Sequence, residues 1–158
     1  MNAGNRNRHW WHGFVLCALL WQPGIAVAEG RFTFSLDGTQ VTDSQTGLTW
    51  RRCSEGQAFS AGTCSGSASV FTREAALAHA RTQSGWRLPN IKELSSIVDT
   101  RRSNPSVDAD AFPATPARHF WSSSPYAGNS YNAWLVHFSG GTVVADNRHD
   151  DSHVRLVR

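Results

Sequence analysis

The chain lacks an apolar run long enough to cross a membrane. Its apolar stretch at residues 14–21 is far shorter than the ~20 residues that a membrane-spanning helix needs. Arg6 and Arg8 precede this stretch, and the small residues 26–28 follow it. This order predicts a signal peptide over residues 1–28. We therefore expect an exported protein, periplasmic or extracellular, without stable membrane insertion once the peptide is removed.

The chain is also poor in cysteine, with three in all. Cys17 falls in the signal peptide, so the exported chain keeps Cys53 and Cys64, and two thiols in an oxidising compartment predict a disulfide. No Cys-x-x-Cys pair or further ligand accompanies them, which argues against a metal or redox site. We therefore expect no cofactor.

A strong excess of charge is missing as well. Removing Arg6 and Arg8 with the signal peptide lowers the net charge from +3 to +1. Without a clustered basic face, nucleic acid is not an expected partner. Residues 29–158 are enough for one domain with a single core. Four tryptophans are expected to supply much of its buried area: Trp50, Trp86, Trp121 and Trp134.

Two helices are predicted near the middle of the chain. Thr72 can cap a helix over residues 73–81, whose composition has high helix propensity. Asn90, with Glu93 three positions later, can form a capping box for a second helix over residues 91–98.

Strands are predicted on both sides of the helices. Residues 31–36 alternate in the strand period, and residues 41–50 resemble a hairpin. Residues 99–119 show no hydrophobic periodicity and are predicted to form a long irregular segment between the regular elements. In residues 134–138 every second residue is apolar, which predicts a strand with one buried face whose intervening residues face outward.

Several segments, in order, resemble the Lcl C-terminal domain family. The most specific is Trp86-Arg87-Leu88-Pro89-Asn90 with Glu93 and Leu94. The resemblance implies an α+β, C-type lectin-like fold with two helices and antiparallel sheets, rich in loops. The matching segments are residues 47–50, 85–94, 120–124, 133–134 and 154–158.

The resemblance implies a binding function. The family takes its name from part of an adhesin reported to bind sulfated glycosaminoglycans, so a glycan or a cell-surface protein is the expected ligand. This chain has no collagen-like repeat. The oligomeric state is left open.

Two other classes of protein stay open. The fold is distantly related to formylglycine-generating enzymes, but those use reactive cysteines near the C-terminus, and here the last cysteine is Cys64. The other class is a structural envelope protein without a specific ligand. We expect no enzymatic activity and no catalytic residues.

Scattered ionisable residues near the C-terminus invite a metal or catalytic interpretation. Four histidines (His119, His137, His149 and His153) are more simply interpreted as surface residues. Three aspartates could surround calcium, but the Glu-Pro-Asn and Trp-Asn-Asp signatures of calcium-dependent sugar-binding lectins are missing, which favours a solvated loop. No metal ligand is predicted.

Three arginines stand inside the family segments. We interpret Arg87, Arg155 and Arg158 as structural, pairing with a carboxylate such as Glu93 or stacking on tryptophan. Anion capture suits exposed arginines better, such as Arg148.

Aromatic, amide and charged side chains gather between the family segments near the C-terminus, where they suit a glycan or a protein epitope. We call this predicted ligand-binding set the C-terminal surface. It consists of Tyr126, Asn129, Tyr131, Asn132, His137, Asp146, Asn147, Arg148, His149, Asp150, Asp151 and His153.

The composition of residues 133–154 suggests how this surface could vary. Asparagine, serine, histidine and related types have codons reachable from AAC by changing its adenines alone. This resembles the variable proteins of diversity-generating retroelements, in which a reverse transcriptase miscopies adenines. Ordinary drift of surface loops would produce a similar composition.

Overall fold

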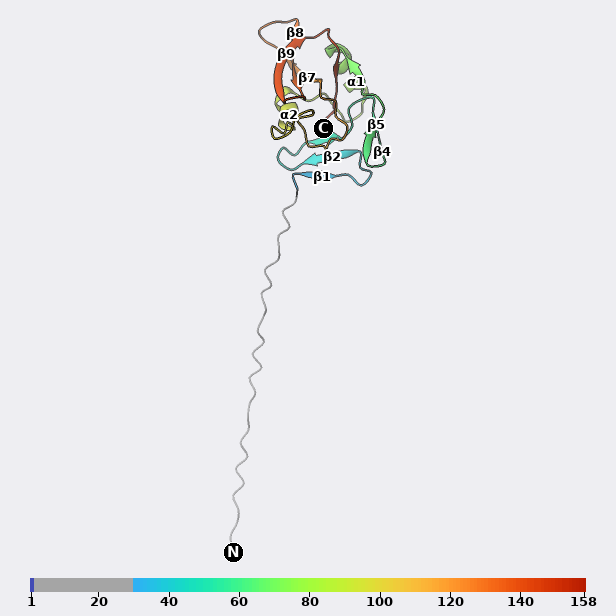
Figure 1. Ribbon diagram of the computed structural model, residues 1–158, viewed down its shortest axis with the longest axis vertical. Helices are drawn as coiled ribbons and strands as arrows, with labels where there is room; N and C mark the ends of the chain where they lie inside the picture. Colours follow the sequence, from blue (N-terminus) through green and yellow to red (C-terminus); the bar gives the residue numbers. More distant parts are fainter. Residues whose placement is uncertain (2–29) are drawn as a thin grey trace.

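A computed structural model describes Met1 and residues 30–158, so the predicted signal peptide and Cys17 lie outside the described residues. Figure 1 shows the arrangement of the elements. In chain order they are β1 (Phe32–Phe34), β2 (Gln40–Asp43), β3 (Thr49–Arg51), β4 (Ala58–Ser60), β5 (Thr63–Ser65), β6 (Val70–Phe71), α1 (Arg73–Thr82), α2 (Ile91–Ser96), β7 (His119–Pro125), β8 (Asn132–His137), β9 (Thr142–Asn147) and β10 (Ser152–His153).

The N-terminal strands form an antiparallel sheet in the order β1-β2-β3. The predicted hairpin at residues 41–50 is present as β2 and β3, with Val41 opposite Trp50. The chain ends against this sheet: the Thr49 and Arg158 backbones exchange hydrogen bonds of 3.0 and 2.9 Å. Val157 bridges to both Trp50 and Arg87. The last residues therefore join the N-terminal sheet to the rest of the domain.

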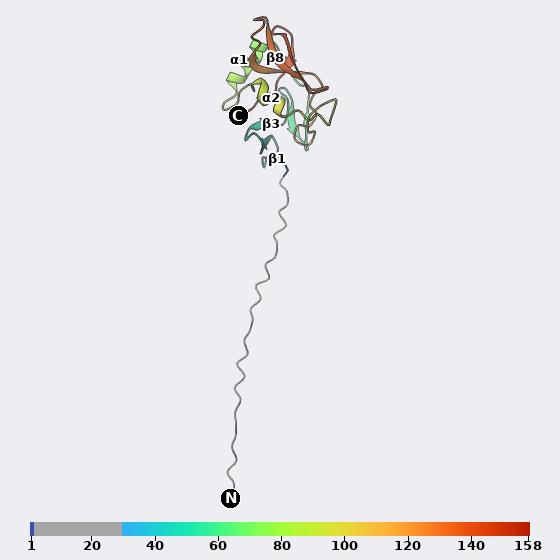
Figure 2. The same cartoon turned by 90° about the vertical axis from the view of Figure 1, so that its left-hand side faces the viewer.

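The larger sheet has five strands in the order β6-β10-β7-β8-β9. One face packs on α1, where Ala76 and Ala80 meet Trp121 and Leu135. The opposite face packs on Leu94 of α2 together with residues from the N-terminal sheet. Figure 2 shows α1 and α2 beside the C-terminal strands. The result is a mixed α+β fold with a core on each side of one sheet.

Both predicted helix starts are confirmed. The Thr72 side chain accepts a hydrogen bond from Ala75 N, and Asn90 and Glu93 form the predicted capping box. The second helix ends at Ser96 and not at Val98 as expected, because Ile97 leaves the helical conformation and its backbone N–H bonds to Ser95 O.

The expectation that β8 has a single buried face is wrong. Val136 and Phe138 are buried as expected, but Leu135 and Ala133, which point the other way, are buried too. They pack on α1, which covers the face that the alternation assigned to solvent. β8 therefore carries buried residues on both of its faces.

The predicted disulfide is present between Cys53 and Cys64, whose Cα atoms lie 5.4 Å apart. Cys64 is the centre of β5, which pairs with β4 in a two-stranded sheet that the sequence did not predict. Residues 65–67 beyond it are exposed.

The four tryptophans divide into two pairs. Trp50 and Trp121 are fully buried, while Trp86 and Trp134 are half-buried. The long irregular segment at residues 99–119 also contributes side chains to the core, because Val107 and Phe112 are fully buried. Among the described residues, no helix is long and apolar enough to span a membrane.

Candidate functional site

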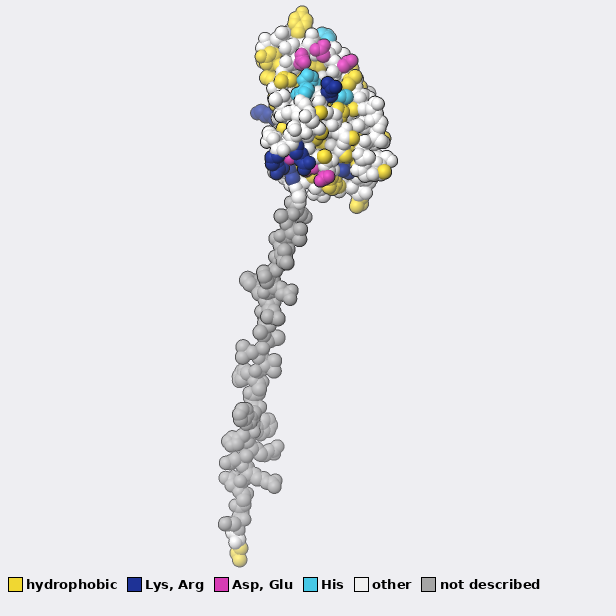
Figure 3. Space-filling model, viewed as in Figure 1, with side chains coloured by type: hydrophobic (Ala, Val, Ile, Leu, Met, Phe, Trp, Pro, Cys, Tyr) yellow, Lys and Arg dark blue, Asp and Glu magenta, His cyan; other side chains and the backbone are white. Residues whose placement is uncertain are grey.

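The C-terminal surface lies along β8, β9 and the turns around them. None of its residues is buried, and half of them are exposed. Figure 3 shows acidic and histidine side chains together on the upper part of the visible face, where Figure 1 draws β7, β8 and β9. The structure thus places these polar side chains on the outside of a sheet whose central strands carry the buried residues.

Strand register divides the C-terminal surface into two ends. Asn132 pairs with Asn147 at one end of β8, and His137 pairs with Thr142 at the other. The length of β8 separates these pairs by about 17 Å. Asn132 and His137 are five positions apart, so their side chains also point to opposite faces of the sheet, and a ligand lying on one face can contact only one of the two.

The first end is built from amide and aromatic residues on a tight turn. Asn129 Oδ1 accepts a hydrogen bond from Tyr131 N at 2.9 Å. Tyr131 O accepts one from Arg148 N, also at 2.9 Å. These bonds fix the backbone of Tyr131. The residue as a whole is 68 % exposed. The turn therefore presents a phenol ring to solvent from a constrained backbone.

Arg148 is not the free guanidinium that the sequence suggested. Its Nη2 donates to Glu74 of α1, and Nη1 donates to Ser130 O at 3.4 Å. Arg73 N also bonds to Arg148 O at 3.0 Å. Arg148 consequently ties the β9–β10 connection to α1, and its charge is already matched by a carboxylate.

A pair of aromatic rings flanks this end. The Tyr126 ring meets the Trp134 ring edge to face, with centroids 5.0 Å apart. Both residues are half-buried. Together with Tyr131 they supply the aromatic area that sugars and protein epitopes commonly contact.

The other end is dominated by histidine. His119 of β7 lies directly opposite His137 of β8, with ring centroids 4.3 Å apart. Burial, the charge of His137 and the charge of Arg118 hold the pKa of His119 below its ordinary value, against an opposing effect of Asp146. The sequence singled out both histidines without predicting that they are neighbours.

His153 departs most from the predicted role. Its Nδ1 lies 3.0 Å from Ser69 O, and its ring packs against buried Phe120 at 5.3 Å. Burial lowers the pKa of His153, although the bond to Ser69 opposes this shift. These contacts anchor β10 and leave the ring little freedom to meet a ligand.

The turn after β9 is organised by Asn147. Its Oδ1 accepts from His149 N and its backbone oxygen from Asp150 N, each at 3.0 Å. Asp150 and Asp151 are exposed. Within residues 30–158 no three histidine, cysteine or acidic side chains are grouped so that they could hold a metal ion.

The arginines of the family segments make structural contacts. Arg87 forms a two-bond ion pair with Glu93, at 2.7 and 2.8 Å, which was one of the predicted pairings. Glu93 also accepts from Asn90 N, and these bonds hold the pKa of Glu93 below its ordinary value in spite of partial burial. Arg158 bonds to Gln40 and lies over the Trp86 ring at 4.8 Å.

Arg155 is fully buried. Its guanidinium donates to the Arg51 and Arg52 backbone oxygens and to the Ser54 and Thr115 hydroxyls. Burial lowers the pKa of Arg155 to about 9, which leaves the group charged at neutral pH. This arginine connects three distant segments and is inaccessible to a ligand.

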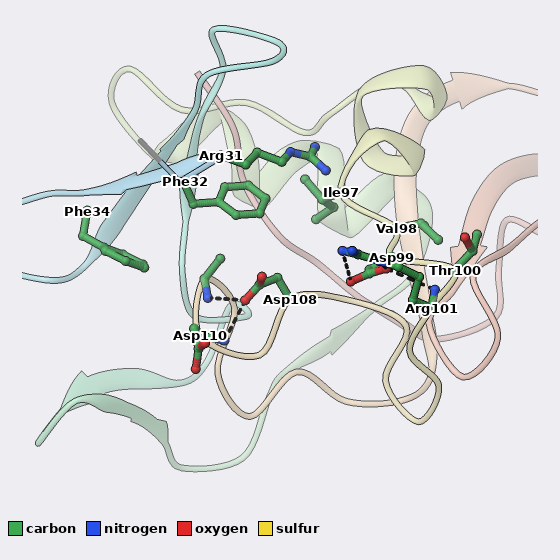
Figure 4. A pocket seen from close by; sticks show the side chains of 12 residues that line it. Arg31, Phe32, Phe34, Ile97, Val98, Asp99, Thr100, Arg101, Asp108 and Asp110 are labelled. Atoms are coloured by element: carbon green, nitrogen blue, oxygen red, sulfur yellow. Dashed lines mark hydrogen bonds and ion pairs between the residues drawn. The ribbon is translucent and has the colours of Figure 1, made fainter. Parts of the chain in front are cut away.

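A cavity of about 330 Å³ between β1 and the segment after α2 was missed by the sequence reasoning. Figure 4 shows Arg31, Phe32, Asp99 and Arg101 among its lining residues. Arg31 Nη2 lies 2.7 Å from an oxygen of buried Asp43, outside the cavity lining. Arg101 pairs with Asp99, whose pKa these bonds lower to about 2. Because these charges are matched within the protein, they indicate no particular ligand.

Trp86 lies between two further cavities, of about 310 and 530 Å³. The guanidinium of Arg51 lies 5.1 Å from its ring. The sequence marked Trp86 as part of a family segment and as a contributor to the core, and nothing in its neighbours along the chain predicts cavities on both sides of it.

These features define a disulfide-linked α+β domain that presents polar and aromatic side chains from a tightly packed sheet. The chain belongs to the Lcl C-terminal domain family, which matches residues 39–158. No curated protein matches the chain.

Proposed function

We propose that this chain is an exported binding module of the C-type lectin-like type, which recognises a glycan or a cell-surface protein through the C-terminal surface. The observation that carries the proposal is the exposure of Tyr131 on a backbone held by Asn129 and Arg148. An aromatic side chain on a backbone that is already fixed can bind without a further loss of backbone freedom.

The packing beneath the surface supports the same proposal. Trp121 of β7 and the neighbouring β8 residues Leu135 and Val136, which point to opposite faces of the sheet, are all buried. Side chains on β8 and β9 can therefore differ in their exposed positions without disturbing the core. Affinity would come from stacking and hydrogen bonds, with no covalent step.

Binding of the exported protein to a glycan array and to intact cells tests the proposal. Tyr131→Ala should weaken binding while the melting temperature moves little, because the removed ring is mostly in solvent. Leu36→Ala is a matched control, since Leu36 is fully exposed on the loop after β1. Unfolding of the Tyr131 variant, or equal binding by both variants, would contradict the assignment of Tyr131.

We further propose that a retroelement diversifies the ligand-binding residues of this module. This proposal rests on the codon composition of residues 133–154 and on the division between packed and displayed residues in β8 and β9. Sequencing the DNA beside the gene tests it. A reverse transcriptase next to a near-copy of these codons, differing only at adenines, would support diversification, and its absence would favour one fixed ligand.

The disulfide supports a binding role over an enzyme of the formylglycine-generating type. Such an enzyme needs reactive thiols, and both cysteines within residues 30–158 are joined to each other. Saturable binding of a ligand would also separate the proposed module from a purely structural envelope protein.

A further inference from the structure

His119 and His137 are in direct contact, and are not merely two residues of the same surface. The two residues occupy directly opposite positions on β7 and β8, and their ring centroids are 4.3 Å apart. Phe138 N donates to Arg118 O at 2.9 Å in the adjacent position. Since antiparallel pairs alternate, His119 and His137 form a non-hydrogen-bonded pair, the type in which side chains lie closest.

Three of the four ring nitrogens of this pair have no hydrogen-bond partner among residues 30–158. His137 Nδ1 is 2.5 Å from the Ser139 hydroxyl, which leaves its Nε2 without a partner. The described part of the chain provides no hydrogen bond to the His119 ring. His79 and His153 differ, because their rings bond to Glu55 and to Ser69 O.

The bond to Ser139 can orient the His137 ring toward a metal at Nε2 when the ring N–H donates and the hydroxyl accepts. Histidine ligands usually donate their second ring N–H to an acceptor in this way, which fixes the ring and its tautomer. Both residues are also partly exposed, so an ion could reach them from solvent.

We propose that His119 and His137 form a two-nitrogen site for a first-row transition-metal dication, with Cu²⁺ bound most tightly in keeping with the usual order of affinities. Water or an oxygen of a bound molecule would complete the coordination shell. Asp146 and Arg118 are the other charged groups that act on His119, with opposite signs. With only two protein ligands, the ion should be exchangeable.

Electron paramagnetic resonance with less than one equivalent of Cu²⁺ tests this site on protein expressed from the full coding sequence without a polyhistidine tag. The spectrum should show two coordinated imidazole nitrogens. His119→Gln and His137→Gln should each remove one nitrogen from the spectrum and weaken Cu²⁺ binding by about tenfold or more. His149→Gln, a substitution at an exposed histidine of the neighbouring turn, should change neither quantity.

A second variant tests the orienting bond. Ser139→Ala keeps both ligands and should weaken Cu²⁺ binding by about tenfold while leaving two nitrogens in the spectrum. Melting curves identify variants that fail to fold. If both glutamine variants fail to fold, the number of nitrogens coordinated in the unmodified protein tests the proposal. A spectrum of the unmodified protein with only one coordinated nitrogen would overturn the proposal. A loss of Cu²⁺ binding in His149→Gln would overturn it as well.

Discussion

Trp121 offers the most direct test of the packing beneath the C-terminal surface. Its side chain is fully buried between β8 and α1, and its Nε1 donates to Phe71 O at 2.8 Å. Trp121→Ala removes the largest side chain of this core and its hydrogen bond to Phe71 of β6. We expect a loss of about 3 to 5 kcal/mol in the free energy of unfolding.

The loss should be measurable as a shift in melting temperature. For a domain of this size, 1 kcal/mol corresponds to about 4 °C, so Trp121→Ala should lower the melting temperature by about 12 to 20 °C. Trp121→Phe keeps most of the ring packing and loses the hydrogen bond, so part of that loss should remain. Circular dichroism under non-reducing conditions follows both variants while the disulfide stays intact.

Trp134→Ala is the matched control, because Trp134 is half-buried on the same sheet. It should destabilise the domain clearly less than Trp121→Ala. A melting temperature for Trp121→Ala within about 2 °C of the unmodified protein would refute the assignment of Trp121 to the core.

Three further predictions concern the tethers of the fold. Replacing Cys53 and Cys64 by serine should lower the free energy of unfolding by about 2 to 3 kcal/mol in urea titrations, because the closed loop is short; an unchanged midpoint would contradict this. Asn90→Ala should lose about 1 kcal/mol in thermal melts through loss of the helix cap, whereas Asn90→Asp should retain most of the stability. Burial alone would raise the pKa of Asp43, but hydrogen bonds led by the one from Arg31 outweigh it and hold that pKa below 3.8. The resulting stabilisation is complete above pH 3.8 and is lost as the pH falls, so Asp43→Asn should flatten the fall of melting temperature below about pH 4, and an equally steep fall would show that Asp43 is not responsible.

Features set by neighbouring residues were predictable from the sequence. The caps at Thr72 and Asn90 depend on residues three positions apart, and both are present. The pairing of Cys53 with Cys64 followed from there being no other cysteine beyond the predicted signal peptide. The ion pair of Arg87 with Glu93 is similarly local.

Features set by distant contacts were not predictable. Leu135 is buried because α1, which precedes β8 by about 50 residues, covers its face of the sheet. Arg148 is bound because Glu74 lies beside it in space, 74 positions earlier in the chain. The pairing of His119 with His137 depends on strand register, which alternation alone does not determine. The C-terminal surface was thus predicted as a set of residues, but its division into two ends was not.

The position of the last residues has a consequence for how the domain forms during synthesis. Arg155 bonds to the Arg51 backbone 104 positions earlier, and Val157 bridges to Trp50 and Arg87. The N-terminal sheet therefore cannot reach its final state until residues 154–158 have left the ribosome. A chain interrupted shortly before that point would carry the entire C-terminal surface and yet have no closed core to display it.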